Sequence, residues 1–235
     1  MKFSLIFGFV FVLAVQSACS ASFGYANQAK WYDDFNQCSY KRQSPIELIT
    51  SEAKISYDLP KLYFHNYDML YPVNVKVENN GHTVNIDLPK VEPATSSLGQ
   101  KIINQILPQI YGGPLHGDRF IAESLHFHWG SNDFHGSEHV IDSTRYTMEM
   151  HLLHRNSKYA TVEEAREHAD GLAVIAFLFQ ANETNYDYYG LSSLIEVLDK
   201  VQEYNTTAEV ESFFNLATLV GDQLDADNYS PMKDL

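Results

Sequence analysis

The feature that most constrains the fold is a pair of alternating segments that meet at a tight turn. Residues 71–78 (YPVNVKVE) and 82–88 (HTVNIDL) alternate apolar and polar side chains, which is the period of a strand with one buried face. Asn79-Asn80-Gly81 separates them, and Asn-Gly tolerates the positive φ that a hairpin turn requires. We therefore expect an antiparallel hairpin here, and a larger sheet around it.

Other segments would extend this sheet. Residues 122–129 and 146–154 have strand character, and residues 172–180 (LAVIAFLFQ) are apolar on both faces, which is typical of a strand at the centre of a sheet. Short helices are expected at residues 161–168, with Thr161 as N-cap, and at residues 191–204. The predicted fold class is mainly β (α+β), with a mostly antiparallel sheet and peripheral short helices.

Composition and charge exclude several classes of protein. The 235 residues are 45% hydrophobic, enough for the packed core of one large domain. Lys and Arg number 16 against 30 Asp and Glu, for a net charge of −14. No basic surface is available for phosphates, so we expect neither a nucleic-acid partner nor docking on anionic membranes. Two cysteines exclude a dense disulfide scaffold and a multi-cysteine zinc module.

The first residues have the character of a targeting segment. Residues 5–15 form an apolar run that is short for a membrane span and long enough for the core of a signal peptide. Small residues follow, so we expect cleavage that removes residues 1–21 and leaves residues 22–235 as the secreted domain. The alternative is an uncleaved signal anchor. No second membrane-length segment follows, so no membrane span is expected in the mature chain.

Two further features fit export from the cell. Asn182, Asn205 and Asn228 each begin an Asn-X-Ser/Thr triplet, the acceptor pattern for N-glycosylation. Cleavage would remove Cys19 and leave Cys38 as the single cysteine of the mature chain. A lone cysteine in a secreted protein is expected to have a partner, on another chain or on sequence not present here.

Histidines carry the main chemical signal, since six of the ten fall between His126 and His154. His126 and His128 are two residues apart in a strand-like segment, so both would point to one face. Glu149 and His151 have the same spacing in the next strand. If the two strands pair, three imidazoles can converge on one point. Zn²⁺ favours such ligands, and three of them leave the fourth position that a catalytic site needs.

The spacing alone leaves two other interpretations open. Histidines on a half-polar strand face often serve only as hydrogen-bonding groups. A cupin-like site for iron or manganese also uses His-x-His with a later carboxylate and histidine, and Glu149 would then be a ligand.

Five motifs in fixed order resemble those of the alpha-class carbonic anhydrases. They lie at residues 42–46 (RQSPI), 78–82 (ENNGH), 125–130 (LHFHWG), 136–139 (GSEH) and 149–154 (EMHLLH). A further segment of that family matches residues 170–174. The resemblance is strong from about residue 23 to 180 and looser to about residue 219, and it favours zinc over the cupin alternative. It also implies a large twisted sheet.

The resemblance implies the reversible hydration of carbon dioxide to bicarbonate and a proton, and hence a role in pH regulation. His126, His128 and His151 match the Zn²⁺ ligands, and zinc-bound hydroxide would attack carbon dioxide. His82 matches the proton shuttle, a task that imidazole suits near physiological pH. Glu138 matches an acid that orients a threonine hydroxyl against the hydroxide.

The surrounding positions have implied roles as well. Glu149 matches the carboxylate that holds the ring of His151. Leu153 and Val174 match the apolar pocket in which carbon dioxide lies. The positions that order water near the shuttle are matched by Tyr25, Asn80 and Asn85.

The sequence departs from the family pattern in two places. Ser124 stands where the family usually has a glutamine that hydrogen-bonds the first zinc histidine. A late threonine- and proline-rich segment, which supplies the threonine for Glu138 and a cysteine for Cys38, does not occur. We therefore expect a domain that lacks its C-terminal part, through an incomplete gene model, a spliced variant or a short protein. The alternative function is a noncatalytic, secreted binding module; the oligomeric state is not indicated.

Overall fold

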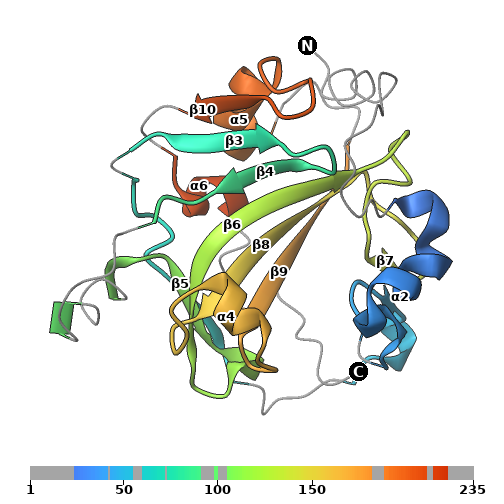
Figure 1. Ribbon diagram of the computed structural model, residues 1–235, viewed down its shortest axis with the longest axis horizontal. Coiled ribbons are helices and arrows are strands. Elements are labelled where there is room, and N and C mark those ends of the chain that lie inside the picture. Colours follow the sequence, from blue (N-terminus) through green and yellow to red (C-terminus); the bar gives the residue numbers. More distant parts are fainter. Residues whose placement is uncertain are drawn as a thin grey trace.

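The computed structural model describes residues 24–41, 43–54, 60–71, 73–90, 98–99, 105–181, 188–210 and 214–221. The expected signal peptide, Asn182 and Asn228 lie outside these residues. The described chain forms a large curved sheet of eight strands with short helices around it, so the predicted fold class is confirmed (Figure 1).

Every strand pair in the large sheet is antiparallel. The order along one path is β10 (Thr207–Val210), β3 (Val75–Asn79), β4 (Val84–Asp87), β6 (Arg119–Trp129), β5 (Gln109–Gly112) and β2 (Leu62–His65). On its other edge β6 pairs with β8 (Met148–Asn156), and β8 pairs with β9 (Leu172–Phe179). A separate parallel pair joins β1 (Glu47–Leu48) to β7 (Val140–Ile141).

The expected hairpin connects β3 to β4. Gly81 has a φ of 87°, in the left-handed region that favours glycine. A Cβ at this position would also lie 2.8 Å from the ring of Tyr204. Backbone conformation and lack of space therefore both require glycine, as the Asn-Gly signal indicated.

The core lies on the face of the sheet that carries Leu125 and Phe127. Helix α5 (Ser192–Leu198) packs there through Leu194 and Val197, and α6 (Leu216–Val220) adds further buried side chains. The remaining short helices are η1 (Tyr25–Lys30), α2 (Trp31–Asp34), η2 (Asn36–Ser39), η3 (Thr50–Glu52), η4 (Gly113–Leu115), α4 (Val162–Arg166) and η5 (Tyr189–Leu191). The opposite face of the sheet is left for the histidines.

Both predicted helices form, but each is shorter than expected. Helix α4 begins after Thr161, whose side chain accepts a hydrogen bond from the backbone N–H of Glu164, as predicted. Helix α5 ends at Leu198, before the predicted end at residue 204, although Val201 stays buried. None of the described helices is long and apolar enough to cross a membrane.

Residues 172–179 form a strand, as predicted, but the strand is not central among the described residues. In the described part of the chain β9 pairs only with β8, so it lies at an edge of the sheet. Its side chains are half-buried, and Val174 is 53% exposed. Apolarity on both faces indicates that a strand can be covered, but it does not decide how many neighbours the strand has.

Candidate metal centre

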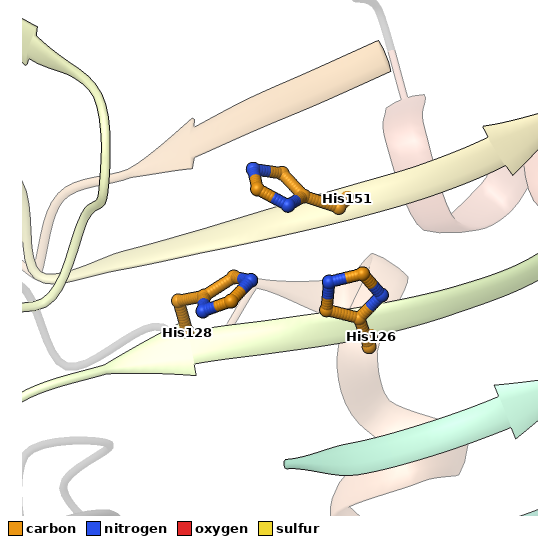
Figure 2. Close-up of side chains that lie close together, drawn as sticks. All are labelled: His126, His128 and His151. Atoms are coloured by element: carbon orange, nitrogen blue, oxygen red, sulfur yellow. The ribbon is translucent and has the colours of Figure 1, made fainter. Parts of the chain in front are cut away.

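Strand pairing brings three imidazoles together on one face of the sheet. His126 and His128 project from β6 on the face opposite Leu125 and Phe127, because strand side chains alternate. Strand β8 places His151 directly across from His126. One ring nitrogen from each histidine lies within 4.8 Å of the other two, and Figure 2 shows the three rings turned toward a common point.

The protonation state of two of these histidines suits a metal ligand. Burial lowers the pKa of both His126 and His128 to about 4, and the neighbouring imidazoles add to the effect. Both rings are therefore neutral at pH 7, and neutral imidazole is the form that binds metal.

Glu149 contacts the ring of His151 and so orients it. Its Oε1 contacts His151 Nε2 and lies 2.5 Å from His139 Nδ1. Its Oε2 accepts hydrogen bonds from the backbone N–H of Glu138 at 2.9 Å and of His139 at 2.8 Å. Burial raises the pKa of this carboxyl, but the hydrogen bonds from His139 and His151 outweigh it and hold the pKa well below its usual range. An ionised carboxylate only accepts, so His151 Nε2 carries a proton and Nδ1 remains for a metal.

A second group of ligand atoms, from His139, Glu149 and His151, also lies within 4.8 Å. The two oxygens of Glu149 already receive four N–H groups there. The group of three histidines is therefore the better candidate for a metal.

Glu138 lies beside the three histidines. Its Oε2 is 3.2 Å from His128 Nε2 and 3.8 Å from His151 Nδ1. The loop that carries it is held by Arg145, whose guanidinium donates to the carbonyl of Ser137 and, at 3.1 Å, to that of Glu138. Arg145 was missed by the sequence analysis, because no local pattern links it to this loop.

The two residues expected in the substrate pocket, Leu153 and Val174, form a row across three strands with Ser124. Ser124 on β6, Leu153 on β8 and Val174 on β9 are in direct register, one step from the row that contains His126 and His151. Within the described residues no hydrogen bond joins Ser124 to His126. The row therefore offers one hydroxyl and two aliphatic side chains beside the metal centre.

His82 is exposed in the turn that precedes β4. Asn80 closes this turn: its Oδ1 accepts from the backbone N–H of His82 at 2.9 Å and of Thr83 at 3.0 Å. Its expected role in ordering water stays a prediction. Asn85 is in register with His126, and its side chain donates to Asp87 at 3.0 Å. Tyr25 begins η1, and its side chain lies outside the described part of the structure.

Two further sequence features are exposed in the structure. Cys38 lies in η2 as a free cysteine. Asn205 directly precedes Thr206 and β10, in a left-handed conformation with a φ of 63°. An acceptor asparagine must be reachable by solvent, and Asn205 meets this condition.

Comparison with known proteins gives one matching family model and several relatives. The family model of the eukaryotic-type carbonic anhydrases matches residues 26–231. The chain is 32% identical over 207 residues to carbonic anhydrase 6 of Mus musculus, covering 86% of this chain and 59% of that protein. It is 34% identical over 189 residues to carbonic anhydrase 4 of Oryctolagus cuniculus, covering 80% and 54%. With carbonic anhydrase 15 of Mus musculus it shares 31% identity over 214 residues, covering 88% and 62%. The chain thus spans less than two thirds of the length of these relatives.

Proposed function

Because the chain belongs to the eukaryotic-type carbonic anhydrase family, we propose that it catalyses the reversible hydration of carbon dioxide to bicarbonate and a proton. His126, His128 and His151 would hold the Zn²⁺ ion. The convergence of these imidazoles on one face of the sheet is the observation that carries the proposal. When bound, the metal would lower the pKa of a water molecule to about 7 and so supply the nucleophile.

The residues around the centre have separate tasks. Glu149 keeps the ring of His151 in one tautomer and one orientation. Glu138 provides a hydrogen-bond acceptor beside His128, where it would orient a reacting hydroxyl group. Leu153 and Val174 would form the apolar wall against which uncharged carbon dioxide lies. His82 is exposed, so it would pass the product proton to solvent buffer.

We also propose that the protein is secreted, with residues 1–21 as a cleaved signal peptide and residues 22–235 as the carbonic anhydrase domain. The apolar run and the small residues after it support cleavage. The exposure of Asn205 supports glycosylation there. Asn182 and Asn228 remain sequence-based candidates.

A second candidate function is a noncatalytic, secreted binding module. Two observations favour it: Ser124 makes no hydrogen bond to His126 among the described residues, and the wall residue Val174 is 53% exposed. Loss of a hydrogen bond to a metal ligand typically lowers metal affinity or activity 10- to 100-fold.

Zinc content and stopped-flow hydration of carbon dioxide, measured on the same protein, separate the two functions. We expect one zinc per chain, and turnover that falls at least about 100-fold in His128→Ala. His168→Ala is the matched control, because His168 is exposed and stacks on Tyr159. Bound zinc without turnover would favour the binding module, and the absence of both would overturn the metal site.

A further inference from the structure

The backbone pairing between β4 and β6 stops inside the metal-binding segment. The pairs run from Asp87 with Ser124 to Asn85 with His126. Phe127 is the next residue of β6, and it separates the two histidines that this strand contributes. A group that hydrogen-bonds the backbone N–H and carbonyl of Phe127 would therefore also hold β6 in place between His126 and His128.

A single side chain makes hydrogen bonds to both the backbone N–H and the backbone carbonyl of Phe127. The hydroxyl of Thr83 accepts a hydrogen bond from the N–H of Phe127 at 3.1 Å and donates one to its carbonyl oxygen at 2.5 Å. A hydroxyl is both donor and acceptor, so it can replace the two bonds that a paired residue would make. Phe127 is 7% exposed, and water would not fully satisfy these groups if the hydroxyl were removed.

Thr83 also belongs to the turn that carries His82. The side chain of Asn80 binds the backbone N–H groups of both residues, and the N–H of Asn80 donates to the carbonyl of Thr83 at 3.2 Å. On the far side, Asn79 donates to the carbonyl of Val201 at 3.0 Å and accepts from the N–H of Asn205 at 2.8 Å. These hydrogen bonds hold the turn in one conformation. The side chain of Thr83 then connects the turn to β6.

We propose that Thr83 is a positioning residue whose hydroxyl sets the spacing between His82 and the strand that carries His126 and His128. This inference rests on the function proposed above. Proton transfer from the metal centre to an exposed imidazole depends steeply on distance and orientation, so a turn that can shift would transfer protons more slowly. In the proposed function, the conversion of carbon dioxide would take place at the bound metal and would not involve His82.

Because proton transfer and carbon dioxide conversion are separate steps, a change at Thr83 should affect kcat and leave kcat/KM nearly unchanged. Thr83→Val keeps the shape of the side chain and removes the hydroxyl. We expect kcat to fall about tenfold, because it includes proton release, while kcat/KM for carbon dioxide stays within about twofold. Thr83→Ser restores the hydroxyl and is expected to stay within about twofold of the unaltered protein in both constants. Added imidazole should restore kcat in Thr83→Val, since a soluble base can replace the displaced ring.

A readout without metal tests the contact itself. Amide hydrogen exchange at Phe127 in the zinc-free protein should be faster in Thr83→Val than in Thr83→Ser. In a background of His82→Ala, Thr83→Val should lower kcat no further, because there is then no ring to position.

The possible failures are distinguishable. If kcat is unchanged in Thr83→Val, or if kcat/KM and zinc content fall along with kcat, Thr83 does not position the shuttle and the inference is overturned. Unchanged exchange at Phe127 would overturn it as well. If the unaltered protein has no turnover, the proposed function fails first, and this inference fails with it.

Discussion

Glu149 shows how much a single buried residue can organise. Its two oxygens receive N–H groups from the side chains of His139 and His151 and from two backbone amides. The side chain is fully buried, so its two oxygens depend on these donors in place of water. The orientation of His151, a proposed metal ligand, therefore depends on a carboxylate that is buried from solvent.

Replacing Glu149 by Gln should weaken zinc binding. One carboxylate oxygen would be replaced by an amide NH₂, which is a donor and cannot accept a hydrogen bond from an N–H group. The ring of His151 would then lose its fixed tautomer. We expect a 10- to 100-fold lower zinc affinity, measured by competition with a chromophoric chelator. Glu196→Gln, on the exposed side of α5, is the control. Equal affinities of Glu149→Gln and the unaltered protein would contradict this role.

A second buried pair has a structural role. The hydroxyl of Tyr67 lies 2.6 Å from His154 Nε2, and both side chains are buried. Burial lowers the pKa of His154 to about 4 and raises the pKa of Tyr67. The neutral imidazole and the phenolic hydroxyl, which keeps its proton, share this hydrogen bond. His154 lies on the face of β8 opposite His151, where it takes part in this structural hydrogen bond.

The titration of His154 predicts acid sensitivity of the fold. Between the unfolded pKa of 6.5 and the folded pKa of about 4, the unfolded chain binds the extra proton, so stability falls as the pH falls. The contribution of His154 approaches about 1.4 kcal/mol per pH unit in this window. His126 and His128, whose pKa values are also about 4, add their own contributions in the zinc-free protein. Urea unfolding of the zinc-free protein at pH 7 and pH 5 measures the total loss. His154→Gln should lose less unfolding free energy between the two pH values than the unaltered protein. Tyr67→Phe keeps the imidazole and should lose as much as the unaltered protein. Equal losses in all three proteins would refute the assignment.

At the scale of elements, β9 differs from the other strands of the sheet. It is eight residues long, contains no charged side chain and no proline, and has one paired edge in the described structure. Edge strands of globular proteins usually carry charges or prolines that prevent association with other strands. We therefore expect the uncharged edge of β9 to promote self-association.

A charge placed on β9 should reduce this tendency. Val174→Lys puts a cation on an exposed position of the strand, whereas Val174→Thr keeps its β propensity without a charge. We expect less association of Val174→Lys than of Val174→Thr in sedimentation velocity runs on the 235-residue chain. The same distribution of species for both variants would show that the edge of β9 does not mediate association.

At the scale of the whole molecule, the candidate metal centre joins two long strands that bind different neighbours. His126 and His128 lie on β6, which also pairs with β4 and β5, and His151 lies on β8, which pairs with β9. Figure 1 shows β6, β8 and β9 running side by side through the molecule. A metal held by residues of both strands would therefore connect the two parts of the sheet.

Zinc should accordingly stabilise the entire domain. Binding to the folded state alone raises the free energy of unfolding by about 4 kcal/mol when free zinc is 1,000 times the dissociation constant. Thermal unfolding with and without zinc measures this shift, with a chelator to reverse it. The shift should vanish in His126→Ala and persist in His168→Ala; a shift retained in His126→Ala would place the ion elsewhere.

Local patterns in the sequence were sufficient for the hairpin of β3 and β4, for the cap at Thr161, and for placing His126 and His128 on one face. Each depends on residues close in the chain, where backbone periodicity and turn chemistry act directly. What only the tertiary structure decided is non-local. Glu123 lies in an irregularity of the β6–β8 register, and after it His151 stands opposite His126.

Three other features also depend on residues far apart in the chain. They are the edge position of β9, the hydrogen bonds from Arg145 to the loop of Glu138, and the hydrogen bonds between Thr83 and Phe127. The alternation of side chains along a strand is the same whichever strand pairs with it. The sequence around a hydroxyl or guanidinium group does not indicate which distant carbonyl will accept its hydrogen bond. The sequence by itself thus determined which side chains share a face. Strand pairing decided which of those faces come together, because register is set by contacts between residues far apart in the chain.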